Sequence, residues 1–449
     1  MPSDSSYLSG VIEGFYGRPW THQQRLALLP RLKARGLNTY MYGPKDDIRL
    51  RARWRELYPA TELEQLGELV RTAERHDLRF IYALAPGLDI RYSDALESER
   101  LLRKVEQIAA LGVQDFVLLF DDIPHALHAD DEAEFGTFAH AQATVSERVF
   151  RRLRELAPSG RRFVCPTDYC GRMAATNPVG WDYLRELTRH LGPDAELFWT
   201  GDEIVSEQIT ADSLATLIAV TGRKPIIWDN LFANDYDLRR AYLGPLTGRS
   251  ADLVSATTGL LLNPNCQFEL NEVAFDTLAE FISSPDDYDP RTAFASALRR
   301  WRPAFELDGG SQLSLERLTL LAELLYLPWF CGPAVEALLS EARTLLAAPP
   351  LGAAERAGNW RRFALEIEQL FSQLTELTDR DLLYALYGLL WEARAESRLM
   401  AGYLALREES GESDPEFGRP DDAENTYRLG FGAAVQALLP LSETGKVAR

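Results

Sequence analysis

Two neighbouring carboxylates, Asp121 and Asp122, directly follow the apolar run Phe116–Phe120. A continuous apolar run of this length is typical of a strand that is buried on both faces. Adjacent carboxylates at the end of such a strand are costly unless each is solvated or hydrogen-bonded, because their charges repel. In an arbitrary sequence such a pair is most often a helix cap beside a solvated acid. A place at the end of a buried strand favours a functional pair instead.

The two carboxylates can do different chemistry. Consecutive side chains near the end of a strand point in different directions, so each acid has its own surroundings. One of them can remain ionised while the other holds a proton, which separates a charged stabiliser from a proton donor. The pair Asp121 and Asp122 therefore has the composition of an acid/base dyad.

Eight short apolar runs rich in β-forming residues must position this pair. We predict strands over Gly10–Glu13, Asn38–Tyr42, Arg79–Ala83, Phe116–Phe120, Arg162–Cys165, Glu196–Trp199, Pro225–Trp228 and Gly259–Leu262. Amphipathic stretches between them predict helices, for example over His22–Arg35, Leu63–His76, Ala95–Leu111 and Ser146–Leu156. Alternating strands and helices of this number favour an α/β fold, a (β/α)8 TIM-type barrel, over an open doubly wound sheet.

Polar and aromatic residues follow most of the predicted strands, where active sites of such barrels lie. The segments after the strands contain Gly14 to Gly17, Gly43 to Asp47, Thr167 to Tyr169, Trp199 to Gly201, Trp228 to Asn230 and Asn263 to Asn265. A sugar has apolar ring faces and a rim of hydroxyls. Aromatic rings can pack against the faces, and amides, a lysine and carboxylates can form hydrogen bonds with the hydroxyls. The strand ends therefore indicate a carbohydrate site.

A second, helical domain is predicted after a break near Phe305–Gln312, which has two glycines and no periodicity. One apolar helix face is formed at three- and four-residue steps by Trp360, Phe363, Ile367, Leu370, Phe371, Leu374 and Leu377. Similar stretches cover Leu313–Leu327, Pro333–Leu346 and Asp381–Arg407. We predict a barrel domain over 1–305 and a helical bundle over 306–449.

Charge and composition narrow the classes of partner. The 449 residues carry a formal net charge of −19, whereas nucleic acids and anionic membranes are bound through clustered Lys and Arg. We therefore expect no nucleic acid and no membrane partner. The first ten residues contain neither a basic nor an apolar leader region, which favours a cytoplasmic location.

Neither a metal site nor a disulfide framework is expected. The four cysteines are too scattered for a CxxC pattern and are predicted to be buried free thiols: Cys165, Cys170, Cys266 and Cys331. A group of histidines and acids in one loop lacks the HExxH spacing of zinc enzymes: His125, His128, Asp130 and Asp131.

Six segments occur in order along the predicted barrel: EGFYGRPW (Glu13–Trp20), YGPKDD (Tyr42–Asp47), LLFDDI (Leu118–Ile123), CPTDYCG (Cys165–Gly171), WDNLFANDYD (Trp228–Asp237) and LNPN (Leu262–Asn265). They resemble the family 84 glycoside hydrolases, and within these the O-GlcNAcases, which remove N-acetylglucosamine from Ser and Thr of proteins. In the helical part, Arg419–Gly430 resembles the stalk domain of the animal members. The departures, Gly43 for an alanine and Asp168 for a glutamate, touch none of the roles below.

The resemblance implies catalytic roles for the two acids. Asp121 would orient and polarise the 2-acetamido group of the substrate, and Asp122 would be the general acid and then the general base. Most retaining glycosidases need a carboxylate nucleophile across the sugar from the acid, and adjacent residues on one strand end fit that geometry poorly. We therefore expect the acetamido oxygen of the substrate to be the nucleophile, through a bicyclic oxazoline and with retention.

The resemblance also implies a binding role for seven residues. The acetamido pocket would be shaped by Tyr169, Trp228 and Asn230. The 4- and 6-hydroxyls would be held by Asp235 and Asn263, and the side of the sugar with the 3-hydroxyl by Lys45 and the backbone at Gly14. Simpler explanations exist for several of them: Lys45 could pair with Asp46 or Asp47, Tyr169 or Trp228 could be core, and Asp235 could cap a helix.

We expect hydrolysis of β-linked N-acetylglucosamine without a cofactor, on a glycoprotein, glycopeptide or glycan. A glycan-directed β-hexosaminidase, a hyaluronidase-like enzyme and a non-catalytic glycoprotein-binding protein are the alternatives, and the helical region could itself be a partner-recognition scaffold. We also expect a homodimer through that region, as in the stalk of the animal members. Its aromatic residues would lie either at the interface or in the core: Trp360, Tyr384, Tyr387 and Trp391.

Overall fold

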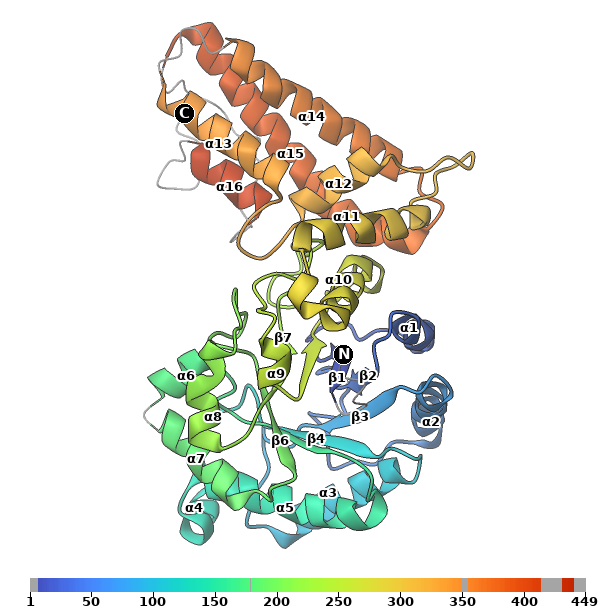
Figure 1. Ribbon diagram of the computed structural model, residues 1–449, viewed down its shortest axis with the longest axis vertical. Helices are drawn as coiled ribbons and strands as arrows, with labels where there is room; N and C mark the ends of the chain where they lie inside the picture. The colour runs from blue at the N-terminus through green and yellow to red at the C-terminus, as the bar shows by residue number, and fades with distance from the viewer. Residues whose placement is uncertain (1–6, 178, 349–353, 413–429, 440–449) are drawn as a thin grey trace. The chain divides into compact units, whose positions relative to one another are not determined.

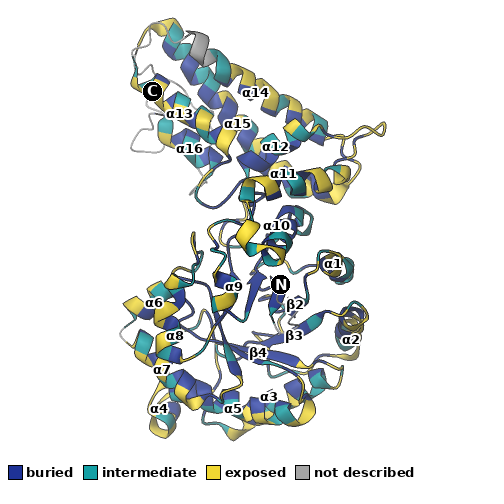
Figure 2. Ribbon diagram, in the orientation of Figure 1, coloured by how far each residue is buried: buried dark blue, intermediate teal, exposed yellow. Residues whose placement is uncertain are grey.

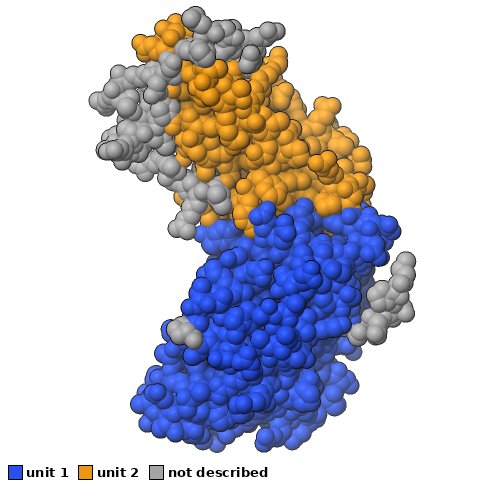
Figure 3. All heavy atoms as spheres, turned by 60° about the vertical axis from the view of Figure 1, so that its left-hand side comes forward, with its two compact units in different colours: residues 1–236, 246–268, 278–288 blue, residues 237–245, 269–277, 289–449 orange. Residues whose placement is uncertain are grey.

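The computed structural model describes residues 7–177, 179–348, 354–412 and 430–439 (Figure 1). The segment Arg419–Gly430, apart from Gly430, lies outside the described residues. The chain divides into two compact units (Figure 3): unit 1 contains residues 1–236, 246–268 and 278–288, and unit 2 contains residues 237–245, 269–277 and 289–449. The units interleave along the sequence, and the domain boundary after residue 305 stays a prediction.

Unit 1 contains a closed barrel of eight parallel strands in chain order, in which β1 pairs with both β2 and β8. The strands are β1 (Leu8–Glu13), β2 (Thr39–Tyr42), β3 (Arg79–Leu84), β4 (Asp115–Leu119), β5 (Arg162–Cys165), β6 (Ala195–Trp199), β7 (Ile226–Asp229) and β8 (Gly259–Leu262). The prediction of an α/β fold with a (β/α)8 TIM-type barrel is confirmed. Every predicted strand is present, with small shifts at the ends.

Helices follow the strands: α1 (His22–Ala34), α2 (Ala60–Arg75), α3 (Ala95–Ala109), α4 (Ala129–Phe135), α5 (Phe138–Leu156), α6 (Gly171–Thr176), α7 (Gly180–His190), α8 (Ala215–Thr221), α9 (Leu253–Ala256) and α10 (Glu272–Ser283). A capping box between Thr21 and Gln24 starts α1. Helix α5 begins well before the predicted Ser146, because its first turns bury small alanines that give no visible apolar period.

Almost every strand residue is buried (Figure 2), which explains the continuous apolar runs in the sequence. Alternate side chains fill the barrel interior and pack against the surrounding helices. Truncating one of them, such as Leu118, to alanine would cost about 2–5 kcal/mol. The barrel is therefore a rigid frame for the loops at the carboxyl ends of its strands.

Unit 2 is helical: α11 (Pro290–Trp301), α12 (Leu315–Leu324), α13 (Pro333–Ala347), α14 (Ala354–Leu374), α15 (Arg380–Ser410) and α16 (Phe431–Leu438). The helical region was predicted, and the seven residues of its predicted apolar face are all buried. Trp360 belongs to this core and stacks on Phe431, whereas Tyr384, Tyr387 and Trp391 are 67%, 42% and 50% exposed on α15. The four aromatics therefore divide between core and surface.

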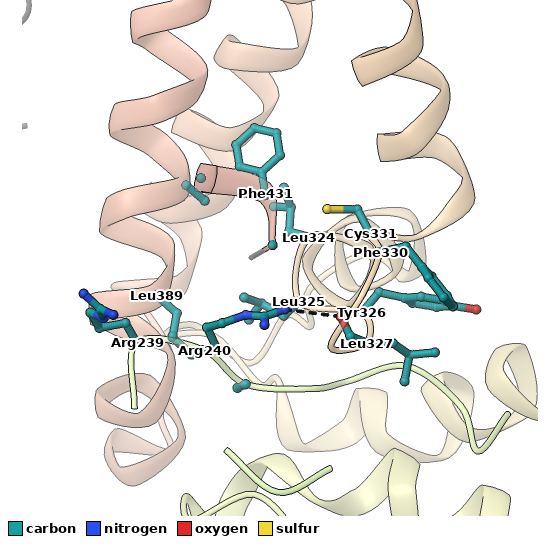
Figure 4. Close-up of a pocket in the computed structure, with 14 residues that line it drawn as sticks. Arg239, Arg240, Leu324, Leu325, Tyr326, Leu327, Phe330, Cys331, Leu389 and Phe431 are labelled. Atoms are coloured by element: carbon teal, nitrogen blue, oxygen red, sulfur yellow. Dashed lines mark hydrogen bonds between the residues drawn. The ribbon is translucent and has the colours of Figure 1, made fainter. Parts of the chain in front are cut away.

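A small cavity in unit 2 is lined mainly by apolar side chains, including Leu324, Leu389 and Phe431 (Figure 4). Arg240 lies along it and donates hydrogen bonds to the carbonyl oxygens of Leu327 and Pro328 at 3.4 and 2.8 Å. The described residues that line this cavity include no carboxylate and no imidazole, so among them there is no acid/base pair. None of the described helices has the length and apolar composition needed to cross a membrane.

Candidate active site

A cavity of about 330 Å³ in unit 1 lies among residues that follow strands β1, β2 and β4 to β8. All nine residues singled out in the sequence line it: Gly14, Lys45, Asp121, Asp122, Tyr169, Trp228, Asn230, Asp235 and Asn263. Its volume is in the range of small-molecule sites. The structure thus brings together residues that are up to 249 positions apart, as Gly14 and Asn263 are (263 − 14).

Asp121 is buried and pairs with the ammonium group of Lys45, whose side chain is also buried. Lys45 Nζ lies 5.4 Å from the centre of the Trp228 ring, within the range of a cation–π contact. The pairing of Lys45 is therefore with Asp121 rather than with Asp46 or Asp47. The second carboxylate oxygen, Asp121 Oδ1, is buried and has no partner among the described residues. One oxygen of Asp121 is fixed, and the other can accept a donor from a ligand.

Asp122 points to different partners. The hydroxyl of Tyr169 donates to its Oδ1 at 2.7 Å, and the hydroxyl of Tyr16 donates to its Oδ2 at 2.8 Å. Burial, reinforced by the charge of Asp122, raises the pKa of both tyrosines above the ordinary phenol range, so both hydroxyls remain donors. Asp122 itself is exposed at the cavity. The two neighbouring acids thus have separate hydrogen-bonding environments.

Tyr16 was not among the predicted site residues, although it lines the cavity. Its position two residues after Gly14, in the segment that follows β1, was the signal that could have indicated it. The sequence gives no sign that its hydroxyl reaches Asp122, because the two residues are 106 positions apart.

The segment that carries Tyr169 is held from behind by helices α5 and α7. Gln142 Nε2 donates to Thr167 Oγ1 at 3.0 Å, and the hydroxyl of Tyr183 both donates to Gln142 Oε1 at 2.6 Å and accepts from the backbone N–H of Thr167 at 2.9 Å. These buried polar groups satisfy one another, which fixes the loop after β5. The orientation of Tyr169 toward Asp122 follows from this anchoring.

A close packing contact explains the glycine at position 14. A Cβ atom at Gly14 would lie 2.3 Å from Cζ2 of Trp228, closer than any side chain tolerates. Trp228 is 5% exposed, and its ring also packs edge-on against Phe198. Gly14 therefore lets the Trp228 ring lie against the backbone and form a wall of the cavity.

The two asparagines of the site form a short chain. Asn263 Nδ2 donates to Asn230 Oδ1 at 2.9 Å, and Asn230 Nδ2 donates to the carbonyl oxygen of Ile204 at 2.8 Å. Asn263 Oδ1 is buried without a partner among the described residues. Next to Asn230, the buried Asp229 pairs with the buried Arg249, which fixes the start of the loop after β7. The free acceptor of Asn263 can therefore take a donor from a ligand.

Asp235 contacts the loop after β1 and is not the N-cap of any helix among the described residues. Its Oδ2 accepts a hydrogen bond from the backbone N–H of Tyr16 at 2.9 Å. Burial raises the pKa of Asp235, while the hydrogen bond from Tyr16 N opposes that shift. A partly buried carboxylate of this kind is an acceptor for the hydroxyls of a ligand.

Within the described part of the chain, no three His, Cys, Asp or Glu side chains gather in an arrangement that could hold a metal ion. His125 instead lies 2.9 Å from Asp168 Oδ1, and Asp131 accepts a hydrogen bond from the hydroxyl of Ser93. All four cysteines are free, and Cys165, Cys170 and Cys331 are buried. The polar side chains that line the cavity are carboxylates, tyrosines, asparagines, one lysine, Thr200 and the buried thiol of Cys165.

Comparison with known proteins agrees with this arrangement. The sequence model of the β-N-acetylglucosaminidase family matches residues 9–309. The chain is 45% identical over 278 residues to the protein O-GlcNAcases of Mus musculus and of Rattus norvegicus, and these matches cover 62% of the chain but 30% of each relative. A solved structure of a mutant O-GlcNAc hydrolase from Thermobaculum terrenum superimposes with a TM-score of 0.76 and 26% identity, over 90% of this chain and 84% of the other. The chain belongs to the β-N-acetylglucosaminidase family.

Proposed function

We propose that this protein is a retaining glycoside hydrolase that removes β-linked N-acetylglucosamine from Ser and Thr of glycoproteins. The observation that carries the proposal is the separation of two adjacent acids: Asp121 is buried against Lys45, and Asp122 is held at the cavity by two tyrosine hydroxyls. Family membership and the names of the mouse, rat and bacterial relatives support the choice of substrate.

In the first step, the acetamido oxygen of the bound sugar attacks the anomeric carbon. The bond to the leaving oxygen breaks, and Asp122 transfers its proton to that oxygen. Asp121 accepts the proton of the acetamido N–H through its unpartnered Oδ1 and stabilises the growing positive charge. The products of this step are a neutral oxazoline and the released hydroxyl of Ser or Thr.

In the second step, water attacks the anomeric carbon from the face that the leaving group has vacated. Asp122, now ionised, takes a proton from the water, and Asp121 returns its proton to the nitrogen as the oxazoline opens. The two inversions give net retention. No cofactor or metal takes part in either step.

The remaining residues bind the sugar in this proposal. Tyr169, Trp228 and Asn230 surround the acetamido group, Asp235 and Asn263 accept the 4- and 6-hydroxyls, and Lys45 and the backbone at Gly14 face the 3-hydroxyl. The unpartnered Asn263 Oδ1 and the partly buried Asp235 support acceptor roles. The ion pair with Asp121 gives Lys45 a second task, the orientation of the catalytic carboxylate.

Turnover of an O-GlcNAc-modified peptide beside chitobiose tests the proposal. Preferential cleavage of the peptide is expected, whereas preference for chitobiose would favour a glycan-directed β-hexosaminidase, and cleavage of hyaluronan a hyaluronidase-like enzyme. Binding of the peptide without release of N-acetylglucosamine would indicate a non-catalytic glycoprotein-binding protein. A homodimer through the helical region and a cytoplasmic location belong to the same proposal, and fractionation of expressing cells tests the location.

A further inference from the structure

Asp122 has a backbone conformation that needs external support. Of the described non-glycine residues, only Asp77 and Asp122 have positive φ, at 47° and 55°. Asp77 follows the end of helix α2, where a left-handed residue commonly terminates a helix. Asp122 follows a strand instead, where such a conformation is strained and persists because surrounding contacts enforce it. The contacts that enforce it at Asp122 should be visible.

Arg51 makes a contact of this kind. Its Nη2 atom donates a hydrogen bond to the backbone carbonyl oxygen of Asp122 at 3.3 Å, although the two residues are 71 positions apart. Arg51 is 7% exposed. The loop that carries it is tied to the barrel, because the backbone N–H of Ala85 donates to the carbonyl oxygen of Leu50 at 3.0 Å. The guanidinium group is therefore held in place by a fixed backbone.

Arg51 also contacts the second partner of the acid. Its guanidinium carbon lies 5.6 Å from the centre of the Tyr16 ring, and the hydroxyl of Tyr16 donates to Asp122 Oδ2. One buried cation thus supports both the backbone of Asp122 and a tyrosine that orients its carboxylate. Within the described residues Arg51 forms no ion pair with a carboxylate, so its contacts are the carbonyl oxygen of Asp122 and the ring of Tyr16.

Arg51 is absent from the described residues that line the cavity, so we expect no direct contact between it and the sugar there. Its contacts with the site are those with Asp122 and Tyr16. This separates Arg51 from Lys45, which lies on the same loop and does line the cavity.

We propose that Arg51 is a positioning residue for the general acid: its guanidinium group holds Asp122 in the left-handed conformation that directs the carboxyl group at the leaving oxygen. The inference rests on the proposed function, because it assigns Arg51 a part in the same reaction.

The proposal predicts a selective defect. Proton donation by Asp122 matters only when the leaving oxygen needs a proton, as in a serine or alkyl glycoside. A positioned general acid raises the rate of such a step by about 10²–10⁴-fold. Replacing Arg51 by methionine keeps the volume and apolar stem but removes the donor and the charge. We expect Arg51→Met to lower kcat/KM on an O-GlcNAc peptide by about 10- to 100-fold and kcat/KM on 4-nitrophenyl β-N-acetylglucosaminide by less than about 3-fold. The ratio kcat/KM is the quantity to compare, because it reports the first step alone, whereas the second step, in which Asp122 is the base, is common to both substrates.

Arg49→Met is the matched control. Arg49 is on the same loop, but its guanidinium group pairs with Glu62 and contacts neither Asp122 nor Tyr16. It should leave the ratio of the two rates at the wild-type value. Arg51→Lys keeps the charge on a shorter donor, so its rate on the peptide should lie between those of Arg51→Met and the wild type. It also serves as the test variant if Arg51→Met fails to fold.

Equal losses on the two substrates in Arg51→Met or Arg51→Lys would show a general distortion and overturn the inference, as would an unchanged rate on the peptide. A wild-type protein that releases N-acetylglucosamine from neither substrate would overturn the proposed function instead. The two failures are therefore distinguishable in one set of assays.

Discussion

Lys45 holds one carboxylate oxygen of Asp121, while the other oxygen, Oδ1, is buried and has no partner among the described residues. The ion pair fixes the plane of the carboxyl group, and the unpartnered oxygen is the atom that can accept the acetamido N–H of a substrate. A loop residue after β2 thereby sets the orientation of an acid at the end of β4. Disturbing this pair should affect catalysis as well as binding.

Lys45→Met should lower kcat/KM by about 10²-fold or more on aryl and peptide glycosides alike, because a displacement of a catalytic group can lower the rate by that factor. It should also destabilise the protein by about 3–5 kcal/mol, since it leaves a buried carboxylate without its partner. Steady-state kinetics and denaturant unfolding measure the two effects. Lys33→Met is the control: its pair with Asp77 is exposed and should contribute less than about 1 kcal/mol. A wild-type kcat in Lys45→Met would remove Lys45 from the catalytic arrangement.

Alanine at each acid should give different substrate profiles. Asp122→Ala should retain much of kcat/KM, which reports the first step, on aryl glycosides, whose leaving groups need little protonation, and lose it on alkyl or peptide glycosides. Asp121→Ala should be impaired on all of them, because the charge on the acetamido group develops whatever the leaving group.

Fluorination of the acetyl group tests the nucleophile directly in the wild-type protein. Each fluorine makes the acetamido oxygen less nucleophilic, so the rate should fall progressively along the series. The configuration of the first product, followed by NMR, should be retained. Participation of the acetamido group would be contradicted by a product of inverted configuration. It would also be contradicted by a rate that does not change with fluorination when bond cleavage is the rate-limiting step.

Asp235→Ala should raise KM and strongly lower kcat/KM, because each hydrogen bond between a hydroxyl and a carboxylate contributes about 1.5–3 kcal/mol.

Binding of the sugar by Asp235 should also depend on pH. Burial raises the pKa of Asp235, so it should become protonated, and lose acceptor capacity, at a higher pH than an ordinary carboxyl group. Affinity for N-acetylglucosamine should therefore weaken as the pH falls, and calorimetry measures it. Asp202→Ala, an exposed acid outside the cavity, is the control. Unchanged kinetics in Asp235→Ala would exclude its contact with the sugar.

Lys104 should make stability depend on pH in the alkaline range. It is fully buried, and burial lowers its pKa from 10.5 to about 8. Between these values the unfolded chain binds the extra proton, so the free energy of unfolding should rise with pH by up to about 1.4 kcal/mol per unit. The difference between wild type and Lys104→Met, measured by denaturant unfolding from pH 8 to 10, isolates this contribution. A difference that stayed constant with pH would mean that Lys104 is charged in the folded protein throughout.

The homodimer prediction depends on the exposed aromatics of α15. Tyr384, Tyr387 and Trp391 are exposed, and Tyr387 and Trp391 stack on each other with ring centres 6.0 Å apart. Light scattering at micromolar concentration should give twice the chain mass, and changing all three residues to serine should give a monomer that remains folded. A monomeric mass for the wild type would contradict the prediction of a homodimer.

Trp360→Ala should instead lower the free energy of unfolding by about 3–5 kcal/mol, because Trp360 is buried in the core of the helical region.

The sequence alone determined the strands of the barrel and the places where chemistry follows them. Each strand is a local signal, a short apolar run bounded by turn residues, and the carboxyl ends of parallel strands must meet at one end of a closed barrel. Residues as far apart as Lys45, Trp228 and Asn263 could therefore be assigned to one cavity before any contact was known. The helical face around Trp360 was local in the same way, because it depends only on spacing along one helix.

Only the tertiary structure decided which side chains touch. Lys45 pairs with Asp121, 76 positions away, although Asp46 and Asp47 are its neighbours in the chain, and Tyr16 reaches Asp122 across 106 positions. The left-handed backbone of Asp122 and the bond from Arg51 that supports it leave no mark in composition or periodicity. Such contacts join loops from different strands, and their partners are selected by the distances and directions that the closed barrel imposes, which no local pattern encodes.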